Sequence, residues 1–99
     1  MRARAQRRRK ETDAEFVARV ARTRGRLERR FWDRAQRLKA ALARCESLAS
    51  GIGEQVQLAL ARAAVRSANR AYLNEDLELA LRKQEGASRI LRRLEASTD

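Results

Sequence analysis

The chain contains no histidine, no proline and a single cysteine, Cys45. One cysteine excludes an intramolecular disulfide, and without histidine the usual Cys/His zinc site cannot be assembled. We therefore expect no metal ion and no other cofactor. Cys45 falls among regularly spaced apolar residues, so we interpret it as a small core residue in a reducing compartment. An intermolecular disulfide or a reactive thiol is the alternative.

Long apolar runs and catalytic motifs are also absent. No stretch approaches the roughly 18 apolar residues needed to span a bilayer, and no secretory apolar segment follows Met1. The sequence shows no nucleophile–base pair and no glycine-rich phosphate loop. We therefore predict a cytoplasmic protein that is not an enzyme, has no small-molecule substrate and does not bind a membrane.

Positive charge is what the chain has in excess, with 24 Lys and Arg against 13 Asp and Glu, a net charge of +11. Residues 1–50 hold 16 basic and 6 acidic side chains, whereas residues 51–99 hold 8 and 7. A GC-rich coding sequence would explain the arginine total but not this asymmetry. A basic excess in one half indicates that this half faces a polyanion and that the other half serves packing.

Residues 1–11 are predicted to form a mobile polybasic arm. After Met1 the arm has no apolar residue larger than alanine, so it cannot bury itself before it meets a polyanion. A solvated charge run or a localisation signal is the alternative interpretation. The arm residues predicted to contact nucleic acid are Arg7, Arg8, Arg9 and Lys10.

The most strongly patterned segment, residues 12–50, is predicted to be one long helix. Thr12 and Glu15 have the spacing of a capping box. Gly25 costs a helix about 1 kcal/mol relative to alanine, which leaves open whether the helix breaks there. Apolar residues recur at heptad spacing and predict a seam for packing or oligomerisation. The seam contains Phe31, Ala35, Leu38, Leu42, Cys45 and Ala49, and it is preceded by Phe16, Val20 and Leu27.

A line of arginines, which we call the arginine stripe, runs beside the seam. At about 100° per residue it lies roughly 80–120° to one side, and at about 1.5 Å per residue it extends roughly 37 Å. The arginine stripe consists of Arg19, Arg26, Arg30, Arg37 and Arg44. Because Glu28 and Glu46 fall on the opposite flank, no acid is expected to neutralise the stripe. We predict phosphate contacts there, with a solvated face as the alternative.

The glycines of Ser50-Gly51-Ile52-Gly53 predict a tight reversal, followed by helices at 54–73 and 75–96. Asn74 is predicted to be the N-cap of the last helix. The middle helix is expected to have one apolar face made of Val56, Leu60, Ala63, Ala64 and Ala68, and another made of Leu58, Val65 and Tyr72.

The predicted fold class is all-α, an antiparallel helical bundle with one long basic first helix, in a single domain over residues 12–99. Only four aromatic residues supply bulk, and alanine dominates the predicted core. Such a core is marginal in a chain of this size. We therefore expect a second copy or a protein partner to complete the bundle. Trp32, on the flank away from the stripe, is expected to pack at the boundary of the core or in an oligomer contact, with base stacking as the alternative.

Residues 32–94 combine a long helix bearing an aromatic residue, a tight reversal, an alanine/leucine helix and a Leu/Arg helix. This order resembles the accessory variability proteins of diversity-generating retroelements, which are basic four-helix bundles. Those proteins form rings and bind RNA and a reverse transcriptase, so the resemblance implies an RNA-handling accessory oligomer. The chain departs from them in having no obvious fourth helix after Leu94. The segments that carry the resemblance most are Ala68-Asn69-Arg70-Ala71-Tyr72 and Ile90-Leu91-Arg92-Arg93-Leu94.

The sequence has two further resemblances. Residues 69–87 are similar to one tetratricopeptide hairpin, and the chain also resembles small helical subunits of CRISPR effector complexes.

The function we predict is a non-enzymatic nucleic-acid-binding accessory subunit, with RNA favoured over DNA and little base readout. The alternative is a helical adaptor or chaperone-like module that docks on an acidic protein. A membrane-surface helix is disfavoured by the acidic residues and the heptad spacing.

Overall fold

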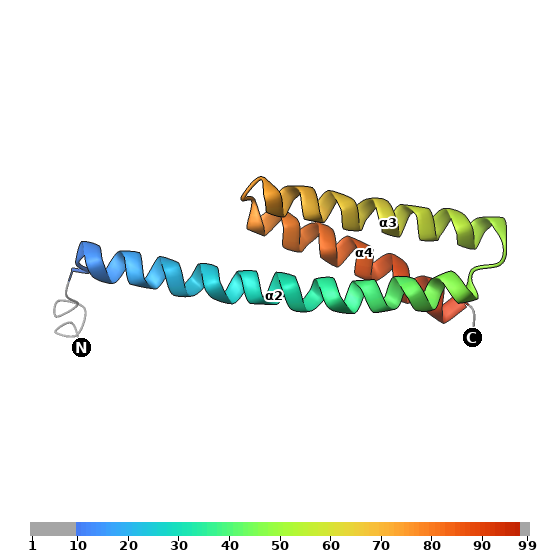
Figure 1. The fold of residues 1–99 in the computed structure, drawn as a ribbon, viewed down its shortest axis with the longest axis horizontal. Helices are drawn as coiled ribbons and strands as arrows, with labels where there is room; N and C mark the ends of the chain where they lie inside the picture. Colours follow the sequence, from blue (N-terminus) through green and yellow to red (C-terminus); the bar gives the residue numbers. More distant parts are fainter. Residues whose placement is uncertain (1–9, 98–99) are drawn as a thin grey trace, which may run out of the picture.

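The computed structural model describes residues 10–97 as three helices joined by two short connections, with no strand in that part of the chain (Figure 1). α2 spans Asp13–Leu48, α3 spans Ile52–Leu73 and α4 spans Leu77–Ser97. The all-α prediction is confirmed, with three helices packed together. The predicted arm, including Arg7, Arg8 and Arg9, lies outside the described residues apart from its last two positions.

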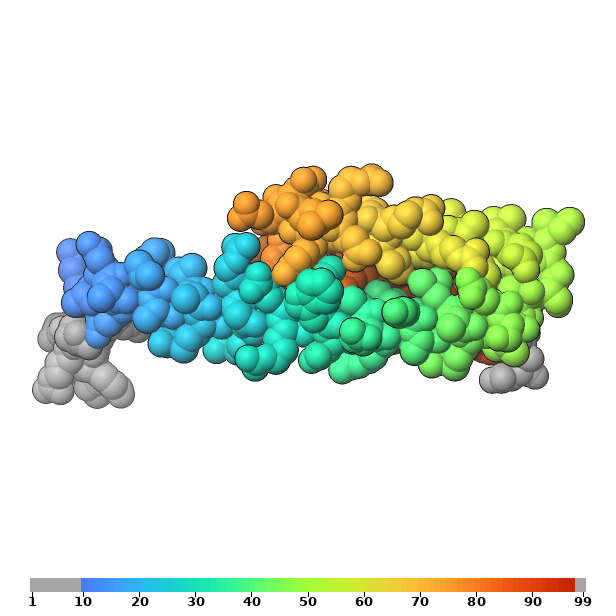
Figure 2. All heavy atoms as spheres, viewed as in Figure 1, coloured from blue at the N-terminus to red at the C-terminus, as the bar shows by residue number. Residues whose placement is uncertain are grey.

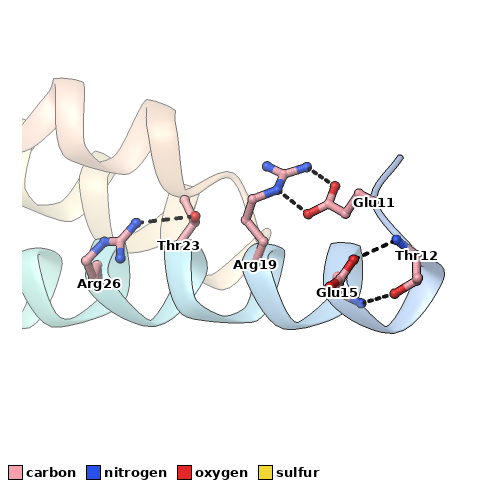
Figure 3. Close-up of polar contacts among 6 residues, drawn as sticks. All are labelled: Glu11, Thr12, Glu15, Arg19, Thr23 and Arg26. Carbon is pink, nitrogen blue, oxygen red and sulfur yellow. Dashed lines mark hydrogen bonds and ion pairs between the residues drawn. The ribbon is translucent and has the colours of Figure 1, made fainter. Parts of the chain in front are cut away.

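α2 is one uninterrupted helix of 36 residues that passes through Gly25, so the helix does not break there. Its N-terminus carries the predicted capping box. The Thr12 hydroxyl accepts from the Glu15 amide at 3.1 Å, and the Glu15 carboxylate accepts from the Thr12 amide at 2.9 Å (Figure 3). These bonds satisfy two amides that lack partners within the helix, and the two acids in this turn favour the positive end of the helix dipole.

α3 runs antiparallel to α2, and α4 returns antiparallel to α3 and therefore parallel to α2 (Figure 1). Three ion pairs between α2 and the segment that contains α4 share one register, because each joins residues 51 positions apart. They are Arg24–Glu75 at 3.7 Å, Arg34–Glu85 at 3.7 Å and Arg44–Glu95 at 2.9 Å. Exposed pairs of this kind contribute about 0.2–1 kcal/mol each, so they mark the register more than they stabilise it.

The core lies where α2 overlaps the α3–α4 hairpin. One cluster contains Leu38, Cys45, Ala49, Leu58, Ala61, Ala87, Leu91 and Leu94, and the other contains Phe31, Ala68, Ala71, Leu77 and Ala80. The seam is therefore buried at Phe31, Leu38 and Cys45 and half-buried at Leu42. Phe16 and Val20 remain exposed, because α2 extends past the end of the hairpin (Figure 1).

Gln84 is the one buried polar residue in the described part of the core. Its side-chain amide donates from Nε2 to the backbone oxygen of Phe31 at 3.0 Å, which ties α4 to α2. The amide oxygen Oε1 has no hydrogen-bond partner among residues 10–97. Gln84 therefore supplies a directional contact in a core that is otherwise built from apolar side chains.

The two predicted apolar faces of α3 are buried to different extents. Val56, Leu60 and Ala63 of the first face are exposed, whereas Ala68 of that face is buried, and Leu58 of the other face packs in the core with Ala61. Both faces have helical spacing, so periodicity alone could not choose between them. Packing against two helices selected the side that pairs Leu58 with the buried positions of α2 and α4. α3 thus keeps a second apolar face toward solvent.

The predicted N-cap of the last helix, Asn74, is wrong. Asn74 ends α3, with its amide donating to the Arg70 carbonyl at 3.0 Å, and Glu75 has a φ of 62°. Asp76 caps α4, because its carboxylate accepts from the Leu79 amide at 3.1 Å. The left-handed residue Glu75 reverses the chain after α3. The N-cap of α4 therefore lies at Asp76, two residues after the predicted Asn74. The start of α3 likewise lies at Ile52, two residues before the predicted position.

Glu54 gives the protein an acid-sensitive contact at the start of α3. Its carboxylate accepts from the backbone amides of Gly51 and Ser50, each at 3.0 Å. The Gly51 bond, followed by the Ser50 bond, lowers the pKa of Glu54 below its ordinary 4.5. A lowered folded-state pKa contributes stability above the unfolded pKa, and that contribution is lost as pH falls through the folded pKa.

We predict that Glu54→Gln lowers the urea midpoint at neutral pH and that its difference from wild type shrinks below about pH 4.5. Glu78→Gln is the matched control, because Glu78 is an exposed acid in the first turn of α4. Urea titrations followed by circular dichroism across this range measure the effect. A Glu54 difference that persists at pH 3, or that equals the Glu78 difference at pH 7, would contradict the assignment.

Candidate nucleic-acid interface

All five members of the arginine stripe are exposed on α2. At the N-terminal end, the Arg19 guanidinium binds both oxygens of Glu11, with Nε at 2.9 Å and Nη2 at 3.2 Å (Figure 3). This hydrogen bond lowers the pKa of Glu11 and raises that of Arg19. Arg19 also lies 5.2 Å from the centre of the Phe16 ring. A carboxylate therefore occupies one end of the stripe.

The other end of the stripe is also paired, because Arg44 Nε donates to Glu95 Oε2 at 2.9 Å. The prediction that no acid neutralises the stripe is therefore wrong at both ends. Glu11 precedes the helix and Glu95 belongs to α4, so neither could be placed from the periodicity of α2 alone. Glu28 and Glu46 pair instead with Arg24 and Arg62, away from the stripe.

The centre of the stripe, Arg26, Arg30 and Arg37, forms no ion pair among residues 10–97. Arg26 makes a long contact of 3.5 Å to the Thr23 hydroxyl (Figure 3). At about 1.5 Å per residue, these three guanidinium groups are distributed over roughly 16 Å of helix. The free positive charge of the stripe is therefore concentrated in its middle.

Two further arginines enlarge this central surface. Arg29 and Arg34 border the same shallow depression on α2 as the three central arginines, together with one acid, Asp33. Sequence reasoning left them out because they lie outside the narrow angular window of the stripe. Their spacing of three and four residues from Arg26 and Arg30 is the signal that a wider window would have used. Because Arg34 also pairs with Glu85, four arginines without an ion pair among residues 10–97 stand against one aspartate, which leaves this surface positive.

A cleft of about 300 Å³ between α2 and α4 adjoins this surface and shares Arg34 and Arg37 with it. Arg44 and Arg92 also line the cleft, but Glu85 and Glu95 stand among them. Arg92 lies 3.8 Å from Glu85. The excess of positive charge therefore continues from α2 toward α4 but is weakened by these two carboxylates.

Trp32 lies on the opposite flank, where it packs at the edge of the bundle. Its indole Nε1 donates to the Tyr72 hydroxyl at 3.2 Å, and its ring meets Phe31 and Tyr72 edge-on, at centroid distances of 5.5 and 5.4 Å. Such edge-to-face contacts hold an aromatic ring in place. This geometry supports the boundary-packing interpretation of Trp32 over stacking on a base.

Residues 10–97 also bear on metal binding, membrane spanning and thiol reactivity. Within residues 10–97, no three His, Cys, Asp or Glu side chains come together in a way that could hold a metal ion. None of the three helices is long and apolar enough to cross a membrane. Cys45 is a buried free cysteine, and burial raises the pKa of its thiol, which disfavours the reactive thiolate.

Comparison with known proteins found no match to the chain among family models, curated proteins or solved structures.

Proposed function

We propose that the protein is a non-enzymatic accessory subunit that binds nucleic acid through its phosphates, with RNA favoured over DNA. The observation that carries the proposal is the exposed row of Arg26, Arg30 and Arg37, which has no carboxylate partner among residues 10–97. A guanidinium presents a planar fork of donors that matches two phosphate oxygens. Because no exposed aromatic belongs to this surface, the contacts position a backbone and do not read bases.

The polybasic residues Arg7, Arg8, Arg9 and Lys10 extend this role in the proposal, because they precede the basic helix and add four cations. The resemblance to retroelement accessory proteins favours RNA and a reverse transcriptase or another nucleoprotein complex as the setting. The described chain supplies three helices, whereas those proteins have four. An accessory role of this kind would therefore involve a second copy or a partner helix.

The buried free thiol of Cys45 fits the reducing cytoplasm that we propose as the location of the protein.

Salt dependence tests the proposal directly. We predict that labelled single-stranded RNA binds in fluorescence anisotropy titrations and that log K falls with log salt. Each neutralised phosphate contributes a slope of about −0.7 on single strands, so three central arginines give roughly −2 before the arm is counted. DNA of the same sequence is expected to bind less tightly. A flat salt titration, or no RNA retained near 0.1 M salt, contradicts phosphate binding.

A second candidate function is a helical adaptor that docks on an acidic protein. The second apolar face of α3, with Val56 and Leu60 each 51% exposed, favours it, because helices apolar on two sides are usually covered on both. Purification at low salt separates the two functions. Nucleic acid recovered with the protein favours the first, and an acidic protein recovered in stoichiometric amount favours the second.

A further inference from the structure

The N-terminal part of α2 extends past the α3–α4 hairpin (Figure 1), and the turn of that hairpin reaches α2 at the Arg24–Glu75 pair. We call residues 13–22, which precede this pair, the overhang. It continues the apolar seam, yet Phe16, Val17 and Val20 are 50%, 63% and 44% exposed. Isolated helices shorter than about 12–15 residues are marginal in water, so an amphipathic segment of this length gains stability from packing. The overhang therefore presents an apolar face that its own bundle does not cover.

An apolar groove of about 550 Å³ runs between α2 and α3. Trp32, Leu42, Val65 and Tyr72 are among the residues that line it, and Gln84 of α4 contributes as well. Figure 2 shows this furrow, with atoms of α4 visible at its floor. Along α2 the groove extends from Phe31 to Leu42, which is about 16 Å of helix, and the ten-residue overhang measures about 15 Å. The two apolar surfaces match in length.

The two surfaces also match in charge when two α2 helices are placed antiparallel around a two-fold axis near position 26. Asp13 of one copy then lies opposite Lys39 of the other, and Val17 and Val20 lie opposite Ala35 and Trp32. Each contact occurs twice, as a two-fold interface requires.

The same register places Arg24 of one copy opposite Glu28 of the other near the axis, so the ion pairs that Arg24 forms with Glu28 and Glu75 of its own copy gain an oppositely charged neighbour. On a helical wheel these positions face away from the arginine stripe, so the pairing leaves the stripe accessible. Opposite charges thus meet in the middle and at both ends of the shared segment, with apolar residues between them.

We propose that the overhang binds the α2–α3 groove of a second copy of this chain, so that each copy supplies the other's bundle with a fourth helix. The occupant is a second copy because the same helix carries both the exposed apolar segment and a complementary surface, in a register that closes on itself. The overhang covers Trp32 and Ala35, whereas the outer face of α3 stays free.

The mass of the full chain in solution, measured without nucleic acid by sedimentation equilibrium, tests the proposal. Wild type is expected at twice the 11.3 kDa of one chain. The double variant Val17→Glu/Val20→Glu is expected at the monomer mass, with helical content retained because both side chains are exposed in one copy. Val56→Glu/Leu60→Glu is the matched control, because it adds the same charges to the exposed face of α3, and it should remain a dimer.

A charge exchange tests the register. Asp13→Lys alone and Lys39→Asp alone should each weaken the dimer, and the combined variant should restore it toward the wild-type dissociation constant. A monomeric wild type, a larger assembly, a dimer that survives Val17→Glu/Val20→Glu, or a combined exchange that restores nothing overturns the proposal. Arg26, Arg30 and Arg37 are untouched throughout, so these outcomes are independent of nucleic-acid binding.

Discussion

Replacing Arg26, Arg30 and Arg37 together by glutamine is expected to lower the affinity for single-stranded RNA roughly 100-fold at low salt. The estimate takes about 1 kcal/mol for each hydrogen-bonded phosphate contact and a tenfold change in affinity per 1.4 kcal/mol. The log–log salt slope should become shallower by about 2, because three phosphates are no longer neutralised. Anisotropy titrations of wild type and variant at several salt concentrations measure both quantities.

The matched control for this experiment is Arg82→Gln/Arg89→Gln/Arg93→Gln on α4. These three arginines are exposed and form no ion pair among residues 10–97, so the control removes the same charge from a different helix. It should retain most of the affinity. An equal loss in both variants would assign binding to net charge, and unfolding of the α2 variant would make its arginines structural.

Replacing Phe31 by alanine is expected to remove about 3–5 kcal/mol of stability, through lost burial and the cavity that remains. Phe31 is 1% exposed, and its ring stacks on Tyr72 with a centroid distance of 4.4 Å. Small domains have only about 5–15 kcal/mol in total. At roughly 4–8 °C per kcal/mol, the melting temperature should fall by at least about 12 °C. Urea and thermal unfolding followed by circular dichroism measure the change.

Leu60→Ala serves as the control for the core substitution, because Leu60 is a large apolar residue on the exposed face of α3. Surface substitutions of this kind usually change stability by less than about 0.5 kcal/mol. A loss from Leu60→Ala as large as that from Phe31→Ala would mean that the outer face of α3 is covered in solution. A loss below about 1 kcal/mol for Phe31→Ala would contradict the assigned core.

The parts of the fold that the sequence predicted are those set by neighbours in the chain. Thr12 and Glu15 define the start of α2, and the heptad spacing after Phe31 predicted which side of α2 packs. The inward side of α3 depends on residues of two other helices, so its own spacing left two choices. The cap at Asp76 depends on the left-handed residue Glu75, for which glutamate gives no sequence signal.

The candidate site also has one feature that the sequence predicted and one that it could not predict. Helical periodicity correctly placed the arginine stripe on one exposed face of α2, because that placement depends only on residues per turn. Its charge balance depends on Glu11, which lies before the helix, and on Glu95, which follows more than 40 residues after α2 ends. Only the folded arrangement brings these carboxylates to the stripe, and it leaves the central arginines without them.

The parallel pairing of α2 with α4 also has a consequence for the order of folding. Its contacts join residues 51 positions apart, whereas the contacts of the α3–α4 hairpin close a connection of three residues. Loop closure costs entropy that grows with loop length, and local contacts generally form sooner. We therefore expect α3 and α4 to assemble as a nucleus on which α2 condenses. In a single copy, where residues 13–22 are not covered by a partner, their backbone amides should then exchange with solvent through local opening, without global unfolding.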